Sequence, residues 1–251
     1  MRTQAWSLII EPAGRPGHEH MAVDHALLRA ARDGAAALRL YRWDPPCLSF
    51  GRNEPALERY DRDRIGALDL ATVRRPTGGR AVWHAEEVTY AVAGPIDLFG
   101  SLRTTYRVIH EMLASAFQAL GIDAALAPNT RGVSPGAGAC FATPAGGEVV
   151  VDGRKLVGSA QVRDGNAFLQ HGSILLEDGQ DLVSRVTRGP PPPVLATSLG
   201  ALLQRRVTFA EVSDAVAAAA QAAWAGTWLL AEPPRMASWE PYDDPAWTWR
   251  M

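Results

Sequence analysis

The sequence predicts an α/β (α+β) chain with a mixed, largely antiparallel sheet flanked by helices. Short apolar segments, several of them alternating with polar residues, recur between Leu8 and Leu176 as the strands of a sheet do. Two longer segments instead repeat their apolar residues at the spacing of a helix. With 251 residues, 47% of them hydrophobic, the chain can bury one sizeable core, so one large domain is expected.

The first half of the chain is expected to mix strands and helices. A strand over residues 8–10 precedes an amphipathic helix over residues 18–31. The half-buried strand 38–43 and the short strand 47–50 are expected to form a hairpin-like pair, because Asp44-Pro45-Pro46 breaks the chain between them. The elements expected next are a short helix over 63–67, an extended segment over 70–73, a turn at Gly78-Gly79 and a strand over 88–92.

The second half begins with the clearest helix of the sequence, residues 103–120. Its apolar side chains fall on one side, and Gly121 marks its end. Asp152-Gly153 separates two apolar segments and predicts a hairpin, because this dipeptide favours turns that match the twist of strands. Residues 167–176 are expected to continue the sheet.

A run of four prolines at residues 190–193 predicts a loop, because successive prolines fix φ and remove hydrogen-bond donors. Residues 1–190 are therefore expected to form the main unit, and residues 191–251 a small helical portion packed on the same domain. Thr208 and Glu211 form a capping box that opens a helix there. The aromatic residues of the segment 239–251 are expected to pack back on the domain.

Composition excludes several classes of function. A net charge of −2 at pH 7 provides no electrostatic reason to bind nucleic acid or a membrane surface. No segment reaches the roughly 18 apolar residues needed to span a bilayer, and no signal peptide is recognised, which predicts a cytoplasmic protein. The two cysteines, Cys47 and Cys140, lie far apart and are expected to be free thiols. No spaced set of ligands points to a metal site.

The segment 74–84 predicts an anion-binding loop. Three guanidiniums and His84 surround Gly78-Gly79, so that cations and backbone N–H groups can converge on a phosphate or carboxylate. The alternative is a surface turn whose arginines are solvated, since a double glycine alone is a weak signal.

Lys155 is the second candidate, because it stands among small and apolar residues. Strand alternation places it on one face with Val157 and Ser159, where an ammonium can polarise a carbonyl or hold a phosphate. The alternative is a lysine on an edge strand whose ammonium reaches water.

Cys140 is the third candidate, preceded by the flexible segment 136–139. A nearby cation such as Lys155 would lower its pKa and make it a nucleophile. The alternative is a small buried hydrophobic residue, which is our interpretation of Cys47. His171 is interpreted as a strand histidine held by hydrogen bonds, and a single histidine without spaced partners does not predict a metal site.

Taken together, these segments resemble the lipoate–protein ligase and octanoyltransferase family, which shares its fold with biotin–protein ligases. Coverage runs from about Trp6 to Glu177, and the matching segments follow the order of the family. They are residues 21–28, 48–53, 74–84, 154–161 and 169–175.

The resemblance implies a catalytic domain over residues 1–190 in which Cys140 and Lys155 are catalytic. It also implies a set of substrate-binding residues drawn from the matching segments. They are Ser49, Gly51, Arg52, Arg74, Arg75, Gly78, Gly79, Arg80, His84, Gly158, Ser159, Ala160, Gln161 and His171.

The implied activity is that of the cysteine-dependent transferases. These take an octanoyl (or lipoyl) group from acyl carrier protein through a cysteine thioester to a lysine of a lipoyl domain or glycine-cleavage H protein, and they need no cofactor. The alternative within the family is an ATP-dependent lipoate–protein ligase, which needs ATP and Mg²⁺ and acts through lipoyl-adenylate. A third reading is a catalytically silent homologue that binds the acyl group or its carrier.

Overall fold

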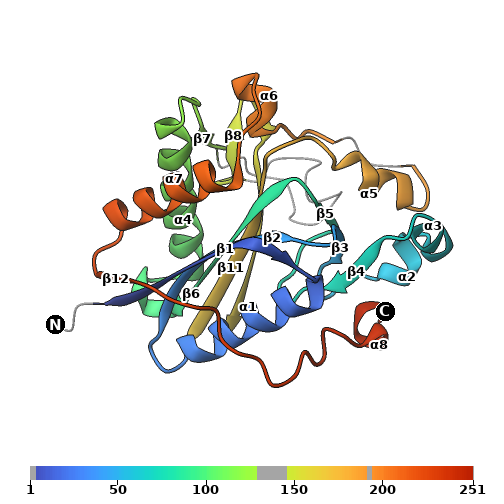
Figure 1. Ribbon diagram of the computed structural model, residues 1–251, viewed down its shortest axis with the longest axis horizontal. Coiled ribbons are helices and arrows are strands. Elements are labelled where there is room, and N and C mark those ends of the chain that lie inside the picture. Colours follow the sequence, from blue (N-terminus) through green and yellow to red (C-terminus); the bar gives the residue numbers. More distant parts are fainter. Residues whose placement is uncertain (1–3, 129–145, 191–193, 251) are drawn as a thin grey trace.

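A six-stranded sheet forms the centre of the molecule in the computed structural model, which describes residues 4–128, 146–190 and 194–250 (Figure 1). Its strand order is β10-β11-β6-β2-β1-β12. The pairs β10·β11, β11·β6 and β6·β2 are antiparallel, whereas β2·β1 and β1·β12 are parallel. The predicted mixed, largely antiparallel sheet is confirmed. The strands are β1 (Ala5–Arg15), β2 (Ala36–Trp43), β6 (Glu87–Pro95), β10 (Val157–Asp164), β11 (Ala167–Leu175) and β12 (Thr227–Leu230).

Helices cover both faces of this sheet (Figure 1). Helix α1 (Gly17–Ala31) packs on one face, while α4 (Leu102–Ala119) and α7 (Phe209–Ala223) pack on the other and on each other. Both helices predicted from apolar periodicity, α1 and α4, are confirmed within two residues of their expected bounds. The central strands are therefore buried on both faces.

Strand β2 shows why the expected half-exposed strand is wrong. Its side chains Leu38 and Leu40 point into the core formed with α4 and α7. Arg39, on the opposite face, is fully buried under α1 because it pairs with Asp24 at 2.7 Å and with Glu11 at 2.5 Å. A paired charge can occupy a position that an isolated charge cannot.

A three-stranded sheet of order β4-β3-β5 lies beside the main sheet. It consists of β3 (Cys47–Phe50), β4 (Ala71–Arg74) and β5 (Val82–His84). The predicted hairpin of β2 with β3 is wrong, because β2 pairs with β1 and β6 while β3 pairs with β4 and β5. The chain changes sheets at Asp44-Pro45-Pro46, so these prolines end one sheet rather than turn a hairpin. Three short helices share an apolar cluster with this small sheet: α2 (Ala56–Arg59), α3 (Arg62–Ala67) and α5 (Asp181–Val186).

A second small sheet contains the predicted Asp-Gly hairpin. Strand β8 (Val149–Val151) pairs with β7 (Ala125–Leu126) and with β9 (Arg154–Lys155). Asp152 and Gly153 have φ angles of 49° and 73°, the left-handed values that such a two-residue turn requires. The chain leaves this sheet at Leu156 and enters the main sheet as β10.

The chain after the proline run contributes α6 (Leu199–Leu203), α7, β12 and α8 (Pro245–Thr248). Thr208 accepts a hydrogen bond from the Glu211 N–H at 3.2 Å, which confirms the predicted cap of α7. Strand β12, which was not expected, adds a sixth strand beside β1. The aromatic tail crosses α1, where the Tyr242 hydroxyl lies 3.0 Å from His25, and Trp249 packs on Phe50. The division at residue 190 stays a prediction.

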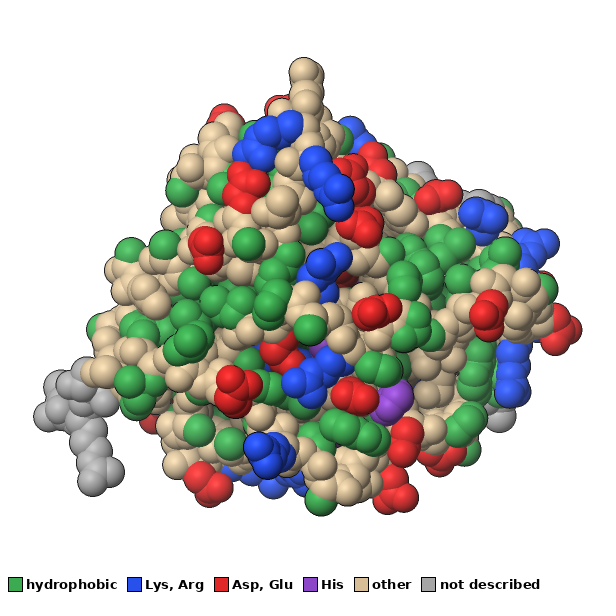
Figure 2. Space-filling model, viewed as in Figure 1, with side chains coloured by type: hydrophobic (Ala, Val, Ile, Leu, Met, Phe, Trp, Pro, Cys, Tyr) green, Lys and Arg blue, Asp and Glu red, His purple; other side chains and the backbone are tan. Residues whose placement is uncertain are grey.

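The surface carries no concentrated charge on the face shown in Figure 2, where acidic and basic side chains are interspersed. Among the described residues, no helix is both long and apolar enough to cross a membrane.

Candidate functional site

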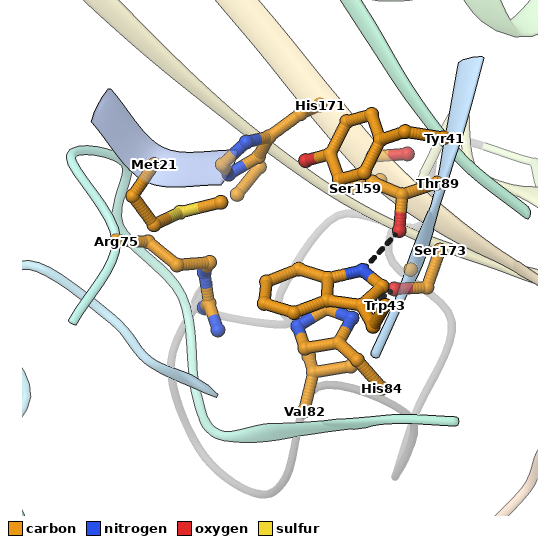
Figure 3. A pocket seen from close by; sticks show the side chains of 13 residues that line it. Met21, Tyr41, Trp43, Arg75, Val82, His84, Thr89, Ser159, His171 and Ser173 are labelled. Atoms are coloured by element: carbon orange, nitrogen blue, oxygen red, sulfur yellow. Dashed lines mark hydrogen bonds between the residues drawn. The ribbon is translucent and has the colours of Figure 1, made fainter. Parts of the chain in front are cut away.

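A narrow slot opens between α1, the small sheet and the strands β10 and β11 (Figure 3). It comprises about 310 Å³ of space between and in front of its walls. Its walls are Met21, Tyr41, Trp43, Arg75, Val82, His84, Thr89, Gly158, Ser159, Ala160, His171, Gly172 and Ser173.

The slot has an apolar wall built around Trp43 (Figure 3). The indole stacks on His84 with ring centres 4.0 Å apart, and its N–H donates to the Thr89 hydroxyl at 2.7 Å. Met21 and Tyr41 face it, and both are fully buried. The stacked His84 ring and the hydrogen bond to Thr89 thus fix the orientation of the indole.

His84 lies in a buried hydrogen-bonded cluster. Its Nδ1 is 2.8 Å from a carboxylate oxygen of Glu87, and its Nε2 is 2.6 Å from the Ser49 hydroxyl. That hydroxyl accepts from Arg75 at 2.6 Å, and the same guanidinium donates to the carbonyls of Ser49, Gly78 and Arg80. The Arg75 guanidinium therefore binds the backbone of the loop to which Arg75 itself belongs.

His171 belongs to a similar cluster on the other side of the slot. Its Nδ1 is 2.9 Å from Asp24 on α1, and its Nε2 is 2.6 Å from the Thr77 hydroxyl. Burial alone would raise the pKa of Asp24, but the hydrogen bond from His171 and the charge of Arg39 outweigh it and lower that pKa. His171 thus joins the loop that carries Thr77 to Asp24 on α1.

Arg74 is placed away from the slot. Its fully buried guanidinium donates to the carbonyls of Gly51, Arg52 and Glu54 and to those of Trp247, Thr248 and Arg250 in the C-terminal segment. Burial, with the neighbouring charge of Arg250, lowers the pKa of Arg74 to about 10. Neither Arg74 nor Arg75 is the solvated surface arginine of the alternative interpretation.

Lys155 is buried, 2% exposed, which excludes the alternative of a lysine reaching water. Its ammonium is 2.6 Å from the Glu148 carboxylate, so this charge is paired inside the protein. Tyr106 approaches the same carboxylate at 3.4 Å and stacks edge-on against His110.

His110 connects this pair to the slot. Its Nε2 is 2.8 Å from the Ser159 hydroxyl, which lines the slot, and its Nδ1 is 2.6 Å from the carbonyl of Gly147. The Tyr90 hydroxyl lies 2.7 Å from the same Ser159 hydroxyl. The ring contact of Tyr106 with His110 therefore joins the Lys155 cluster to the hydrogen bonds that reach the slot.

We expect the free energy of unfolding to fall as the pH drops from 6.5 towards 4. Burial, reinforced by the charge of Lys155, lowers the pKa of His110 to about 4. Between pH 6.5 and pH 4 this histidine is therefore protonated in the unfolded chain but neutral in the folded chain. The contribution of neutral His110 to the free energy of unfolding is fully present above pH 6.5 and is lost as the pH falls from 6.5 to 4. It amounts to roughly 3 kcal/mol. Burial also lowers the pKa of His20 and of His84, which acts in the same direction.

Urea unfolding at pH 7 and pH 4.5 measures this loss. His110→Gln should flatten the pH dependence, whereas the matched change of the partly exposed His18 on the surface of α1, His18→Gln, should leave it unchanged. Equal slopes for His110→Gln and the unmodified chain would contradict the assignment.

The other predicted residues divide between the slot and its surroundings. Gly158 and Ala160 line the slot, whereas Gln161 bonds to Gln170 at 3.1 Å and does not. Gly51 packs so closely on the loop that a Cβ there would lie 2.0 Å from the Gly79 carbonyl oxygen. Arg52 is exposed.

The predictions also concerned the two cysteines and a metal site. Cys140 lies outside the described residues. Cys47 is fully buried, as its structural interpretation expects, and burial raises the pKa of its thiol. Within residues 4–128, 146–190 and 194–250, no three His, Cys, Asp or Glu side chains gather in a geometry that could hold a metal ion.

Several residues of the site were not identified from the sequence. Asp24, Glu87 and Glu148 each support a predicted residue without lining the slot. Met21 and Trp43 form its apolar wall. The only available signal was position, since Asp24 and Glu87 fall in or next to segments singled out for other residues.

Comparisons with known proteins show which family the chain is similar to. The profile of the family described as "Lipoyl protein ligase A/B catalytic domain" matches residues 16–221. The octanoyltransferase LipM of Kyrpidia tusciae is 43% identical over 197 residues, which cover 74% of this chain and 72% of that protein. The octanoyltransferase LipM of Symbiobacterium thermophilum is 39% identical over 231 residues, covering 85% of this chain and 84% of that protein.

Solved structures share the fold. Lipoate-protein ligase A bound with ATP superposes with a TM-score of 0.74 at 21% identity, covering 93% of this chain and 91% of that one. Protein Ta0514 of T. acidophilum, a lipoate protein ligase homologue with bound lipoic acid, superposes with a TM-score of 0.76 at 20% identity, covering 99% and 100%. At these identities the likeness establishes the architecture alone.

Proposed function

Since the chain belongs to the lipoyl protein ligase A/B catalytic domain family, we propose that it moves an octanoyl (or lipoyl) group from acyl carrier protein, through a thioester on Cys140, to one lysine of a lipoyl domain or of glycine-cleavage H protein. That the chain is an acyltransferase acting in protein lipoylation follows from relatives up to 43% identical that are octanoyltransferases. The donor, the thioester and the acceptor are the proposal.

The slot is the observation that carries the proposal. It has an apolar wall of Met21, Tyr41 and Trp43, against which the hydrocarbon chain of an acyl group can be buried. Its other wall brings Ser159 and the backbone of Gly158 and Ala160 close to the cluster of Lys155. An acyl group lying in the slot would therefore bury its chain and keep its carbonyl near polar groups.

The proposed chemistry has two steps. The thiolate of Cys140 attacks the carbonyl carbon of the octanoyl thioester, and the carrier thiolate leaves. The neutral amine of the acceptor lysine then attacks the new thioester, the Cys140 thiolate leaves, and the amine loses a proton as the amide forms. One thioester replaces another in the first step and an amide replaces a thioester in the second, so ATP is not needed.

Lys155 is assigned to the oxyanion that develops in each step. A buried ammonium that is already oriented stabilises such a charge more than a solvated one does. Glu148 holds the ammonium in place at 2.6 Å, so the cation is positioned before the acyl group arrives. The same charge would favour the thiolate over the thiol at a nearby cysteine.

The experiment that tests this is the intact mass of an apo lipoyl domain and an apo H protein after incubation with the enzyme. One set receives octanoyl acyl carrier protein without ATP, the other lipoate with ATP and Mg²⁺. An octanoyl mass gain without ATP supports the transferase and identifies its acceptor. A gain only with lipoate, ATP and Mg²⁺ would make the chain a ligase, and binding without any covalent product would make it a silent homologue.

A further inference from the structure

A one-way chain of hydrogen bonds joins Arg75, which lines the slot, to Glu87, which does not. Arg75 can only donate, and it donates to the Ser49 hydroxyl at 2.6 Å. Ser49 lies 2.6 Å from His84 Nε2, and His84 Nδ1 lies 2.8 Å from Glu87. We call these four residues the Arg75–Glu87 relay.

The direction of each bond follows from its two ends. An ionised carboxylate only accepts, so the Nδ1 of His84 carries the proton. Burial lowers the pKa of His84 more than the nearby Glu87 raises it, which leaves the ring neutral and its Nε2 an acceptor. The Ser49 hydroxyl, which accepts from Arg75, must therefore donate to Nε2.

Stability alone does not account for Glu87. It is 1% exposed, and one of its carboxylate oxygens is bonded to His84 and to the Thr89 hydroxyl, whereas the second has no hydrogen-bond partner among the described residues. A buried carboxylate oxygen without a partner costs free energy, and native structures contain few such groups. The unpaired oxygen is a cost to folding that a role of Glu87 in the site would explain.

Arg75, at the other end of the relay, indicates what that role is. The second arm of the Arg75 guanidinium donates to the carbonyls of Gly78 at 3.1 Å and of Arg80 at 2.8 Å, and so shapes the loop beside the slot. Gly79 within that loop has a φ of 92° and packs against the Arg75 side chain. The position of the guanidinium and that of the loop are therefore coupled through these hydrogen bonds.

We propose that Glu87 is a positioning residue of the acyl site: through His84 and Ser49 it fixes the guanidinium of Arg75 and, with it, the loop 78–80 at the slot. The expected change in kinetics rests on the proposed octanoyl transfer, whereas the expected change in the position of the loop does not. Ser49 and His84 then serve as links of the relay, and the imidazole has no proton to exchange with substrate.

Kinetics with octanoyl acyl carrier protein test the consequence. Ser49→Ala cuts the relay in the middle, Glu87→Gln keeps its shape but removes the charge, and Ser213→Ala removes a buried hydroxyl elsewhere, on α7. Both relay variants should raise KM more than they lower kcat, with a loss in kcat/KM of about 10²-fold at most, the scale expected for small misplacement. The double variant should be no worse than the more affected single one.

Nitrogen NMR tests the geometry independently of activity. His84 should show a protonated Nδ1 and an unprotonated Nε2, and Ser49→Ala should shift the amide signals of Gly78 and Gly79, which Ser213→Ala should leave in place. A protonated Nε2 in the unmodified enzyme, unmoved glycine signals or unchanged kinetics in both relay variants would overturn the proposal. If the unmodified enzyme transfers no octanoyl group, the proposed function fails while the NMR result still decides the relay.

Discussion

Serine in place of Cys140 is expected to reduce octanoyl transfer by about 10³-fold or more, the scale seen when an enzyme loses its nucleophile. The sequence contains two cysteines, and the structure excludes one of them. Cys47 is fully buried, and burial together with the charge of Glu87 raises the pKa of its thiol, so it holds almost no thiolate at neutral pH. A cysteine mechanism in this chain therefore requires Cys140.

The matched variant is Cys47→Ala, which removes the other sulfur. It should leave kcat/KM within about threefold and cost on the order of 1 kcal/mol of stability, as the loss of a small buried side chain does. Transfer of labelled octanoyl from the carrier protein measures activity, and intact mass of the enzyme detects the acyl-enzyme, which Cys140→Ser should not form. Full turnover by Cys140→Ser would remove the thioester from the mechanism.

The features predicted well from the sequence are those decided by neighbouring residues. Apolar residues recurring along 103–120 specify one face of a helix whatever that face contacts, and α4 follows this pattern. Asp152-Gly153 specifies its turn through the φ angles that only a few residue types adopt readily. The cap of α7 at Thr208 is equally local.

The features predicted wrongly depend on contacts between distant segments. Nothing in strand 47–50 indicates that its partners are β4 and β5 rather than β2. The four residues of β12 become a strand only because β1 offers an edge. Short strands contain too few residues for their own pattern to select a partner.

The candidate site divides in the same way. The sequence identifies Lys155, His84 and His171 by residue type and motif, but not the carboxylates that hold them. Asp24 reaches His171 across 147 positions of the chain, and no spacing rule connects the two. Arg74 was likewise predicted from residue type to bind substrate, and the sequence did not indicate that six backbone carbonyls accept hydrogen bonds from its guanidinium.

Methionine in place of Lys155 is expected to lower kcat/KM by about 10² to 10³-fold, the range for removing one group that stabilises an oxyanion. The two side chains are similar in length, so the change removes the charge and the hydrogen bonds but little volume. It also takes away the cation paired with the buried Glu148, and breaking such a pair costs about 3–5 kcal/mol of stability. Lower activity by itself would therefore not distinguish a lost catalytic group from a damaged fold.

The double variant Lys155→Met/Glu148→Gln separates these two effects. It removes both charges, so the stability lost in Lys155→Met should largely return, because a neutral amide is far less costly to bury than a carboxylate. Activity should not return, since the ammonium is still absent. Urea unfolding and octanoyl transfer on the same samples make the comparison, and recovery of transfer together with stability would mean that Lys155 supports the fold and does not act on the acyl group.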